Sequence, residues 1–255
     1  MAEAIPPYDP ELYLLVHRGT PGDLGWYVDA TEGCRRVLEL GCGGGRILEG
    51  IGSAHPDVEL VGLDVHPGLL ARAQERLGGR AALFEADMRS FCFERRFDAV
   101  IIPYSGFWCL GTDADRAACL TRVRDHLEPR GRLLLDAYAA DAWHVGPEEE
   151  GGTATEFLTV TDEGDGQGWE IWEETTWRPE EKAFTARYRH ERRGPLDARG
   201  ARVDGVIEHR YLLADELRGQ IEASRMTVTR LQAGFHGERF DVDATHLVLE
   251  AEARE

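Results

Sequence analysis

The sequence has no apolar run that is long enough to cross a membrane. Apolar stretches such as residues 100–102 and 133–135 are far shorter than the roughly 20 residues that a spanning helix needs. Residues 1–10 are acidic and contain proline, and no basic region is followed by an apolar one, so we expect no secretory signal peptide. These absences predict a cytoplasmic protein that has no membrane partner.

Positive charge is scarce. Lysine and arginine together number 29 against 47 aspartates and glutamates, which gives a formal net charge of −18 at pH 7. Such a field repels a nucleic-acid backbone, so we expect no nucleic-acid partner. The same field favours cationic substrates such as amines, although an acidic surface also serves solubility alone.

Paired cysteines are absent as well. The five cysteines are an odd number, and no two of them form a C-x-x-C pair. The sequence therefore predicts neither a disulfide framework nor a zinc site, and it fits a reducing compartment. We expect no bound metal ion.

Apolar runs alternate with amphipathic segments through the first half of the chain, as they do in βαβ units. Because these runs are continuously apolar, they indicate strands of a parallel sheet with helices on both faces. Later segments supply another helix and two closing strands. The expected core strands are 36–40, 59–63, 81–85, 97–102, 132–136, 226–231 and 245–251, and the expected helices are 46–54, 67–77, 113–127 and 214–223.

The pattern changes after Trp143. Over residues 153–213, aromatic and β-branched residues alternate with polar ones, which predicts three or four antiparallel strands in a separate small sheet. Its Trp169, Trp172 and Trp177 are expected either to line a substrate pocket or to form the core of this sheet.

The sequence thus predicts one α/β core that is interrupted by one insertion. The inserted sheet is expected to cover the substrate pocket as a lid or to pair two copies into a homodimer, because exposed sheet edges invite pairing. The expected divisions are a core with an N-terminal helix (1–145), an inserted antiparallel β subdomain (146–213) and a segment that completes the core sheet (214–255).

The main functional signal is the glycine-rich turn E-L-G-C-G-G-G at residues 39–45, which follows the first expected strand. Glycine permits positive φ angles and lets a ligand approach the backbone closely. A turn at the carboxyl end of a strand also lies where α/β sheets bind their ligands. Dinucleotide-binding enzymes need a further glycine at the position of Arg46, so the sequence argues against a dinucleotide oxidoreductase or epimerase.

An acidic residue closes the second expected strand. Asp64 follows Gly45 by nineteen residues, and a carboxylate at this position can accept both hydrogen bonds from a ribose diol. Its charge also disfavours a ribose that carries a 2′-phosphate. Aspartate at a strand end is also common as a helix cap, and the glycine turn upstream favours the ribose role.

The glycine-rich turn resembles motif I of the class I S-adenosyl-L-methionine (SAM)-dependent methyltransferases, and the wider match is to a group of bacterial small-molecule methyltransferases. This resemblance implies a Rossmann-like, doubly wound, seven-stranded α/β sheet. It also implies an enzyme that uses SAM as its cofactor and methylates a small-molecule acceptor. The matching segments are 8–13, 95–98, 127–133, 210–217 and 240–243.

The resemblance also implies roles for single residues. Asp87, after the third strand, is expected to meet the adenine amino group, and Met88 is expected to pack on the adenine ring. In related enzymes the N-terminal helix lies over the cofactor, which makes Tyr8, Tyr13 and Arg18 candidates for the methionine carboxylate. The full predicted cofactor set is Tyr8, Tyr13, Arg18, Glu39, Gly41, Cys42, Gly43, Gly45, Asp64, Val65, Asp87, Met88 and Pro103.

The catalytic residues are less well marked. Relatives often carry Phe-Asn after the proline that follows the fourth strand and a histidine farther on, whereas this chain has Tyr104-Ser105 and Cys109. An amine or hydroxyl acceptor must lose a proton, and the candidates for the base or orienting group are Tyr104, His17 and His144. We expect a nitrogen acceptor; the alternatives are O-methylation of a hydroxylated or phenolic metabolite and a non-catalytic SAM-binding protein.

Overall fold

The computed structural model describes residues 8–144, 152–160, 168–193 and 201–254. It divides into two compact units, a smaller one of residues 1–18 and 147–211 and a larger one of residues 19–146 and 212–255. The predicted boundary at 145–146 lies outside the described residues. Residues 1–18 group with the inserted segment, whereas the sequence predicts them as part of the core.

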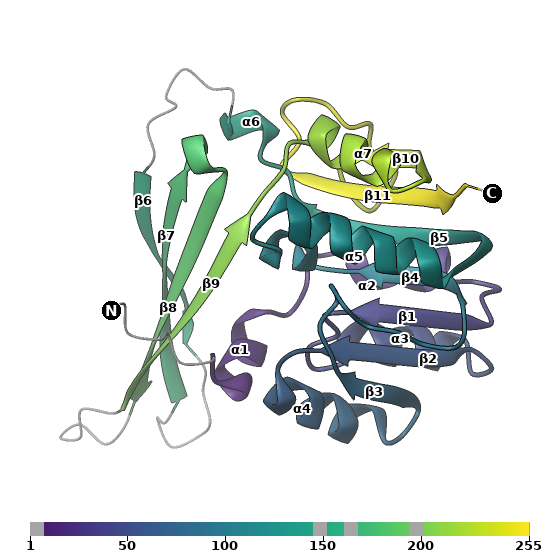
Figure 1. Cartoon of the computed structure of the whole chain (residues 1–255). Coiled ribbons are helices and arrows are strands. Elements are labelled where there is room, and N and C mark those ends of the chain that lie inside the picture. The colour runs from purple at the N-terminus through teal and green to yellow at the C-terminus, as the bar shows by residue number, and fades with distance from the viewer. Residues whose placement is uncertain (1–7, 145–151, 161–167, 194–200, 255) are drawn as a thin grey trace. The chain divides into compact units, whose positions relative to one another are not determined.

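Seven strands form the sheet of the larger unit (Figure 1). Their order across the sheet is β10 (Met226–Gln232), β11 (His246–Ala253), β5 (Leu127–Tyr138), β4 (Phe97–Ile102), β1 (Arg36–Leu40), β2 (Glu59–Asp64) and β3 (Ala81–Glu85). Strands β1 to β5 run parallel, β11 runs antiparallel to β5, and β10 runs antiparallel to β11. The predicted doubly wound, seven-stranded α/β sheet is confirmed.

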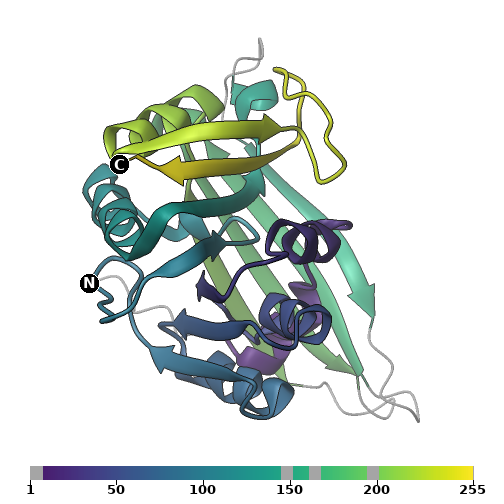
Figure 2. The ribbon, with the colours of Figure 1, turned by 90° about the vertical axis from the view of Figure 1, so that its right-hand side faces the viewer.

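Helices cover both faces of this sheet (Figure 2). On one face, α2 (Asp23–Ala30), α3 (Arg46–Ala54) and α4 (Pro67–Leu77) pack side by side, and on the other α5 (Asp113–His126) packs with α7 (Ala214–Ala223). Within the described ranges, no helix has the length and apolar character that a bilayer span requires.

The core between the sheet and α2–α4 follows from the apolar periodicity of the sequence. In α4, Leu69, Ala73 and Leu77 are buried, and their spacing of about one turn places them on one face of the helix. Gly62 of β2 allows α3 to lie close, because a Cβ at this position would come within 2.7 Å of Leu48 Cδ1. The glycine and the apolar stripe together seat the helices directly on the strands that carry the site.

Strand β5 is longer than predicted. The helix expected through 127 ends at His126, and β5 begins at Leu127, which pairs with Phe97 of β4. Pro129 cannot continue a helix, and a register shift after Phe97 absorbs the residues that precede Arg132. Helix α2 was not predicted, because its apolar positions show only weak helical periodicity.

The smaller unit is a four-stranded antiparallel sheet. Its order is β6 (Gly152–Val160), β7 (Gly168–Arg178), β8 (Ala183–Arg193) and β9 (Arg202–Arg210). This agrees with the predicted antiparallel strands.

Helix α1 (Pro10–Val16) belongs to the smaller unit. Asp9 caps it, since its carboxylate accepts the N–H groups of Glu11 and Leu12 at 3.0 and 3.1 Å. The buried Leu12 packs in one apolar cluster with Tyr188 of β8. The N-terminal helix therefore has its packing partner in the four-stranded sheet.

Candidate functional site

The candidate site lies where the strand order of the large sheet reverses. From β1 the chain continues through α3 to β2, and from β4 it continues through α5 to β5 in the opposite direction across the sheet. Open α/β sheets bind ligands beyond the carboxyl ends of their strands at such a point. The glycine-rich turn, Asp64 and Pro103-Tyr104 all stand at these strand ends.

Two glycines of the glycine-rich turn have different roles: one faces open space and the other allows close packing. Gly43 has a φ of 50°, and a Cβ built on it would meet no atom of the described residues within 4 Å. A Cβ on Gly45 would instead lie 3.0 Å from Leu77 Cδ1 and 3.2 Å from Ala73 Cβ of α4. Gly43 thus leaves the backbone open to a ligand, while Gly45 lets α4 pack closely.

Asp64 fixes this turn from the end of β2. Its Oδ2 accepts the Gly43 N–H at 2.8 Å, and its Oδ1 accepts the His66 N–H at 2.8 Å. The side chain is nearly buried, yet each carboxylate oxygen can accept a second hydrogen bond. Asp64, the residue predicted to bind the ribose, can therefore accept further hydrogen bonds beside the open face of Gly43.

Glu39 is a buried carboxylate with an oxygen that lacks a donor. The residue is 3% exposed, and Oε2 has no hydrogen-bond partner among the described residues. Burial raises the pKa of Glu39 well above its ordinary value, although the charge of Arg46 and the Leu48 N–H act against this rise. Because an unpaired buried carboxylate is costly, this position is suited to a cationic or hydrogen-bond-donating group of a ligand.

Apolar residues border the turn. Val65, directly after β2, is 64% exposed, and Met88 Cε lies 3.5 Å from the position that a Cβ on Gly41 would take. Cys42 and Pro103, which were also predicted to contact the cofactor, are buried. Val65 and Met88 offer the kind of apolar surface on which a flat ring packs.

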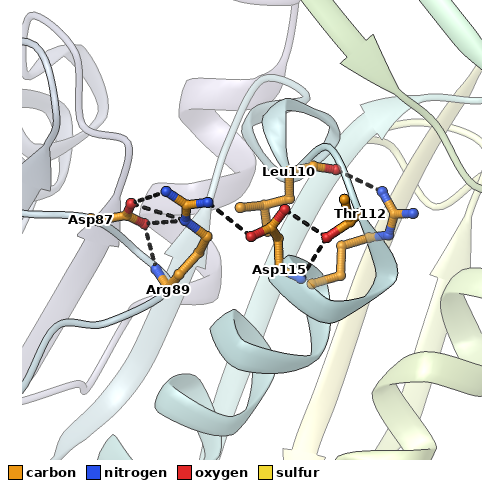
Figure 3. A network of polar contacts seen from close by, with 6 residues as sticks. Asp87, Arg89, Leu110, Thr112 and Asp115 are labelled. Atoms are coloured by element: carbon orange, nitrogen blue, oxygen red, sulfur yellow. Dashed lines mark hydrogen bonds and ion pairs between the residues drawn. The ribbon is translucent and has the colours of Figure 1, made fainter.

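Asp87 is paired with an arginine (Figure 3). Arg89 Nε lies 2.9 Å from Asp87 Oδ2, and its Nη1 reaches Asp115 Oδ1 at 2.8 Å. Asp115 belongs to the first turn of α5, where its N–H donates to the capping Thr112 hydroxyl. The hydrogen bond from Arg89 is the main cause of the lowered pKa of Asp87. The predicted contact of Asp87 with an adenine amino group stays a prediction, and no sequence pattern indicates the pairing with Arg89.

The turn after β4 contains two consecutive residues with positive φ. Tyr104 has a φ of 53° and Ser105 a φ of 60°. The Tyr104 N–H donates to Oδ1 of Asp136, a fully buried residue of β5, at 2.8 Å. Sequence reasoning missed Asp136, whose signal was a single acid in the otherwise apolar run L-L-L-D-A of residues 133–137.

The predicted N-terminal site residues lie in the smaller unit. The Tyr8 hydroxyl is 3.2 Å from His190 Nε2, and the Tyr8 ring stacks on Tyr188 at a centroid distance of 5.5 Å. Tyr13 packs against the His17 ring. Exposed Arg18 donates from Nε to Leu15 O at 2.9 Å. These contacts give the tyrosines a packing role within their own unit, and their cofactor roles stay predictions.

The histidines of the smaller unit are held neutral. Burial, followed by the neighbouring His209 and His190, lowers the pKa of His17 to about 3. Burial lowers the pKa of His209 to about 4. A base of such low pKa takes up a proton poorly near pH 7, so the environment of His17 does not support the predicted base role.

Lowering the pH from 7 to 5 is expected to destabilise the smaller unit. Because the folded-state pKa values of His17 and His209 lie below 6.5, the unfolded chain binds more protons in this range. The stability is present above pH 6.5 and falls by about 2 kcal/mol per histidine at pH 5, from about 1.4 kcal/mol per pH unit. Urea unfolding at both pH values measures this loss, and H17F should lose about 2 kcal/mol less stability than the wild type over the same range. Equal loss in the two proteins would contradict the assignment.

The remaining candidate base, His144, ends the short helix α6 (Asp141–His144) in the larger unit. Tyr104 belongs to the same unit and stands at the strand-order reversal, whereas His17 belongs to the smaller unit. The described ranges contain no group of three or more His, Cys, Asp or Glu side chains that could hold a metal ion.

Two tryptophans of the small sheet already have cationic partners. The Arg192 guanidinium lies 5.2 Å from the Trp169 ring centroid, and that of Arg189 lies 5.3 Å from the Trp172 ring centroid. Each ring thus has one face taken by an arginine of the neighbouring strand. This pairing gives both side chains a partner within the small sheet, and their place around a substrate amine stays a prediction.

Residues 37–131 match the protein family described as a methyltransferase domain. The match runs from β1 into β5 and contains the glycine-rich turn, Asp64 and Tyr104.

Individual relatives act on different acceptors. The dTDP-3-amino-3,4,6-trideoxy-alpha-D-glucopyranose N,N-dimethyltransferase of Streptomyces venezuelae is 31% identical over 112 residues, 42% of this chain and 46% of that protein. A trans-aconitate 2-methyltransferase of Methylobacterium nodulans is 44% identical over 100 residues, 39% of this chain and 37% of that protein. The chain spans about half or less of the length of these relatives.

A solved structure resembles the chain over its whole length. The sugar N-methyltransferase KedS8 from Streptoalloteichus sp. ATCC 53650 matches with a TM-score of 0.77 at 18% identity, covering 100% of this chain and 96% of that chain. At this identity, the likeness establishes the shared fold.

Proposed function

We propose that this chain, which carries a class I SAM-dependent methyltransferase domain over residues 37–131, transfers the methyl group of SAM to a nitrogen atom of a small-molecule amine. SAM is the cofactor of this family of enzymes. The observation that carries the proposal is the arrangement of Glu39, Gly43 and Asp64 at the reversal of strand order.

The residues at this edge fit SAM group by group. The donor-free oxygen of Glu39 suits the cationic ammonium of the methionine part, and the remaining lone pairs of Asp64 suit the ribose diol. Open space at Gly43 admits the ligand to the backbone, and Val65 and Met88 offer apolar surface for adenine. Three groups of the cofactor, its ammonium, its ribose diol and its adenine, thus have matching residues at this edge of the sheet.

When bound, SAM supplies a methyl group on a positively charged sulfur, which is already activated for in-line displacement. The chain's own task is therefore to hold the acceptor close and aligned and to keep water away. The amine attacks through a free lone pair, so an ammonium must lose a proton before transfer; the nitrogen becomes cationic when the methyl group is added, and this product loses a proton afterwards. Tyr104, at the end of β4, is the candidate that stands at this edge of the sheet.

A nitrogen acceptor is supported by two independent features. Two of the relatives described above are named for sugar nitrogen methylation, one of them at 31% identity over 112 residues. The net charge of −18 also attracts a cationic amine and raises its local concentration. We therefore propose that the acceptor is a small molecule in solution. Either a single chain or a homodimer would bind it.

Methylation of a carboxylate oxygen is the second candidate. It is favoured by the 44% identity to a trans-aconitate 2-methyltransferase over 100 residues. The acidic field opposes it, because a polycarboxylate is repelled by a chain of this charge.

Calorimetric titration with SAM, S-adenosylhomocysteine and NAD tests the cofactor, and a panel of acceptors then tests the reaction. We expect micromolar binding of the first two ligands, no binding of NAD, and a gain of methyl mass on amino-sugar nucleotides. If only carboxylic acids are methylated, the proposed nitrogen acceptor is wrong and the protein is a carboxylate O-methyltransferase. SAM binding without turnover of any class would leave a SAM-binding protein that is not an enzyme.

Binding of SAM is expected to release a proton from Glu39. In the free protein the raised pKa of Glu39 favours the neutral acid, and a bound cation favours the carboxylate. Between the two pKa values, SAM affinity should rise with pH by up to about tenfold per unit. Calorimetry in buffers of different ionisation enthalpy measures the released proton. E39Q should remove this component, and equal proton release by both proteins would contradict the role of Glu39.

A further inference from the structure

Asp136 is a charged residue in an apolar strand. It is 0% exposed, and its neighbours Leu133, Leu134, Leu135 and Ala137 are equally buried. A carboxylate in such surroundings is costly unless several donors satisfy it. The hydrogen-bond partners of Asp136 therefore have to compensate for the cost of burying it.

Three elements of the larger unit supply those partners. The Tyr27 hydroxyl of α2 donates to Oδ1 at 2.7 Å, and the Tyr104 N–H donates to the same oxygen at 2.8 Å. His246 Nε2, at the start of β11, lies 3.1 Å from Oδ2. One carboxylate oxygen thus joins α2 to the turn after β4, and the other reaches β11.

The turn that Asp136 holds is strained and is clamped to β5 at three points. Tyr104 and Ser105 both have positive φ, which non-glycine residues rarely adopt. Besides the Tyr104 bond, the Ser105 N–H donates to Asp136 O at 3.0 Å, and the Tyr138 N–H donates to Ser105 Oγ at 3.1 Å. Such strain persists only where the surroundings over-determine it, and it concentrates at functional sites.

The strained turn lies on the side of the strand-order reversal that is opposite the predicted cofactor residues. Glu39, Gly43 and Asp64 occupy the β1–β2 side of the strand-order reversal, and the Tyr104–Ser105 turn occupies the β4–β5 side. With the cofactor on the first side, the second side is where an acceptor must be aligned.

We propose that Asp136 is a positioning residue, whose Oδ1 holds the Tyr104–Ser105 turn in the conformation that aligns the acceptor. The purpose of the turn rests on the methyl transfer proposed above, whereas the way in which it is held does not. Asp136 acts through the backbone of Tyr104 and does not itself touch the reacting atoms.

Three variants separate this role from general stability. D136N keeps an acceptor oxygen for both the Tyr27 hydroxyl and the Tyr104 N–H, and its amide donates to His246 in the other tautomer. Y27F removes one hydrogen bond from the same oxygen without touching the turn. The double variant Y27F/D136L removes the acceptor together with a buried hydroxyl that would otherwise lose its partner, which favours folding.

Amide exchange at Tyr104 and Ser105, SAM affinity and kcat are measured for each protein. We expect the double variant to exchange Tyr104 at least about tenfold faster than Y27F, since it loses the bond from that amide. We expect its kcat to fall by about 100-fold through misalignment of the acceptor. D136N and Y27F should stay within about threefold of the wild type in kcat, and all variants should keep SAM affinity within about threefold.

The outcomes for the inference and for the proposed function differ. Unchanged exchange at Tyr104 in the double variant would overturn the inference even if no acceptor is ever turned over. Loss of kcat in D136N equal to that of the double variant would also overturn it, because the acceptor oxygen is retained there. Failure of the wild-type protein to bind SAM would contradict the proposed function and leave the exchange result intact.

Discussion

Replacing Gly43 by valine is expected to lower the affinity for SAM by at least about a thousandfold, or about 4 kcal/mol. The Cβ of a residue at this position points into space that no described atom occupies within 4 Å. A branched side chain there fills the approach to the backbone amides of the turn, so the ligand loses both contact and volume. The free protein has room for the added atoms and carries only the left-handed strain of valine, about 1–2 kcal/mol, so the loss of contact and volume arises in the complex.

The control for this prediction is a second glycine with nearly the same backbone. Gly78, at the end of α4, has a φ of 56° against 50° for Gly43, and a Cβ on it also meets open space. G78V carries the same left-handed strain, about 1–2 kcal/mol, directly after the last residue of α4, where a Cβ meets no described atom within 4 Å. We expect G78V to lower the melting temperature and to bind SAM normally, as calorimetry would show.

The two variants together decide what the turn does. If G43V retains SAM binding, the glycine-rich turn is only structural and the cofactor site lies elsewhere. If both variants lose binding in proportion to their loss of stability, backbone strain rather than a blocked approach is responsible. G43A, which adds a single methyl group, should fall between the wild type and G43V.

Helices of the core were predictable from the sequence where residues typical of helix ends stand at their boundaries. Residues 46–54 and 67–77 form helices with the predicted bounds, the first after Gly45 and the second between His66 and Gly78. Strand β5 departs from the prediction because its first residues pair with Phe97 across a register shift, which only the neighbouring strand determines. Likewise, residues 1–18 group with the inserted sheet through contacts that no local pattern reveals.

The candidate site was predictable where strand ends define it. Asp64 and the glycine-rich turn come together because β1 and β2 are adjacent and parallel, and the sequence order of a βαβ unit implies this. Asp136 was missed because its partners are remote: Tyr27 is 109 residues away and His246 110 residues away. The pairing of Asp87 with Arg89 was missed for a different reason, since two charges that stand two residues apart do not indicate the directions of their side chains.

Replacing Asp64 by alanine is expected to weaken SAM binding by about 100-fold or more. Hydrogen bonds to a charged group contribute about 1.5–3 kcal/mol each, and a ribose diol supplies two. The substitution also releases the Gly43 N–H, which Asp64 Oδ2 accepts at 2.8 Å, so the turn loses its support from β2. D64N keeps one carbonyl acceptor and should lose less, about tenfold. D57A, in the loop before the same strand, removes an exposed negative charge and should bind as the wild type does.

The ribose role and the support of the turn can be told apart with a second ligand. Removing the 2′-hydroxyl from S-adenosylhomocysteine should weaken binding to the wild-type protein by about 1.5–3 kcal/mol if Asp64 accepts a hydrogen bond from it. In D64A the same change to the ligand should cost almost nothing, because the partner is already absent. Losses from two groups that contact each other are non-additive. Combining D64A with the removal of the 2′-hydroxyl therefore tests whether Asp64 contacts that hydroxyl directly. Equal losses in the two proteins would show that Asp64 shapes the turn and leaves the ribose to another residue.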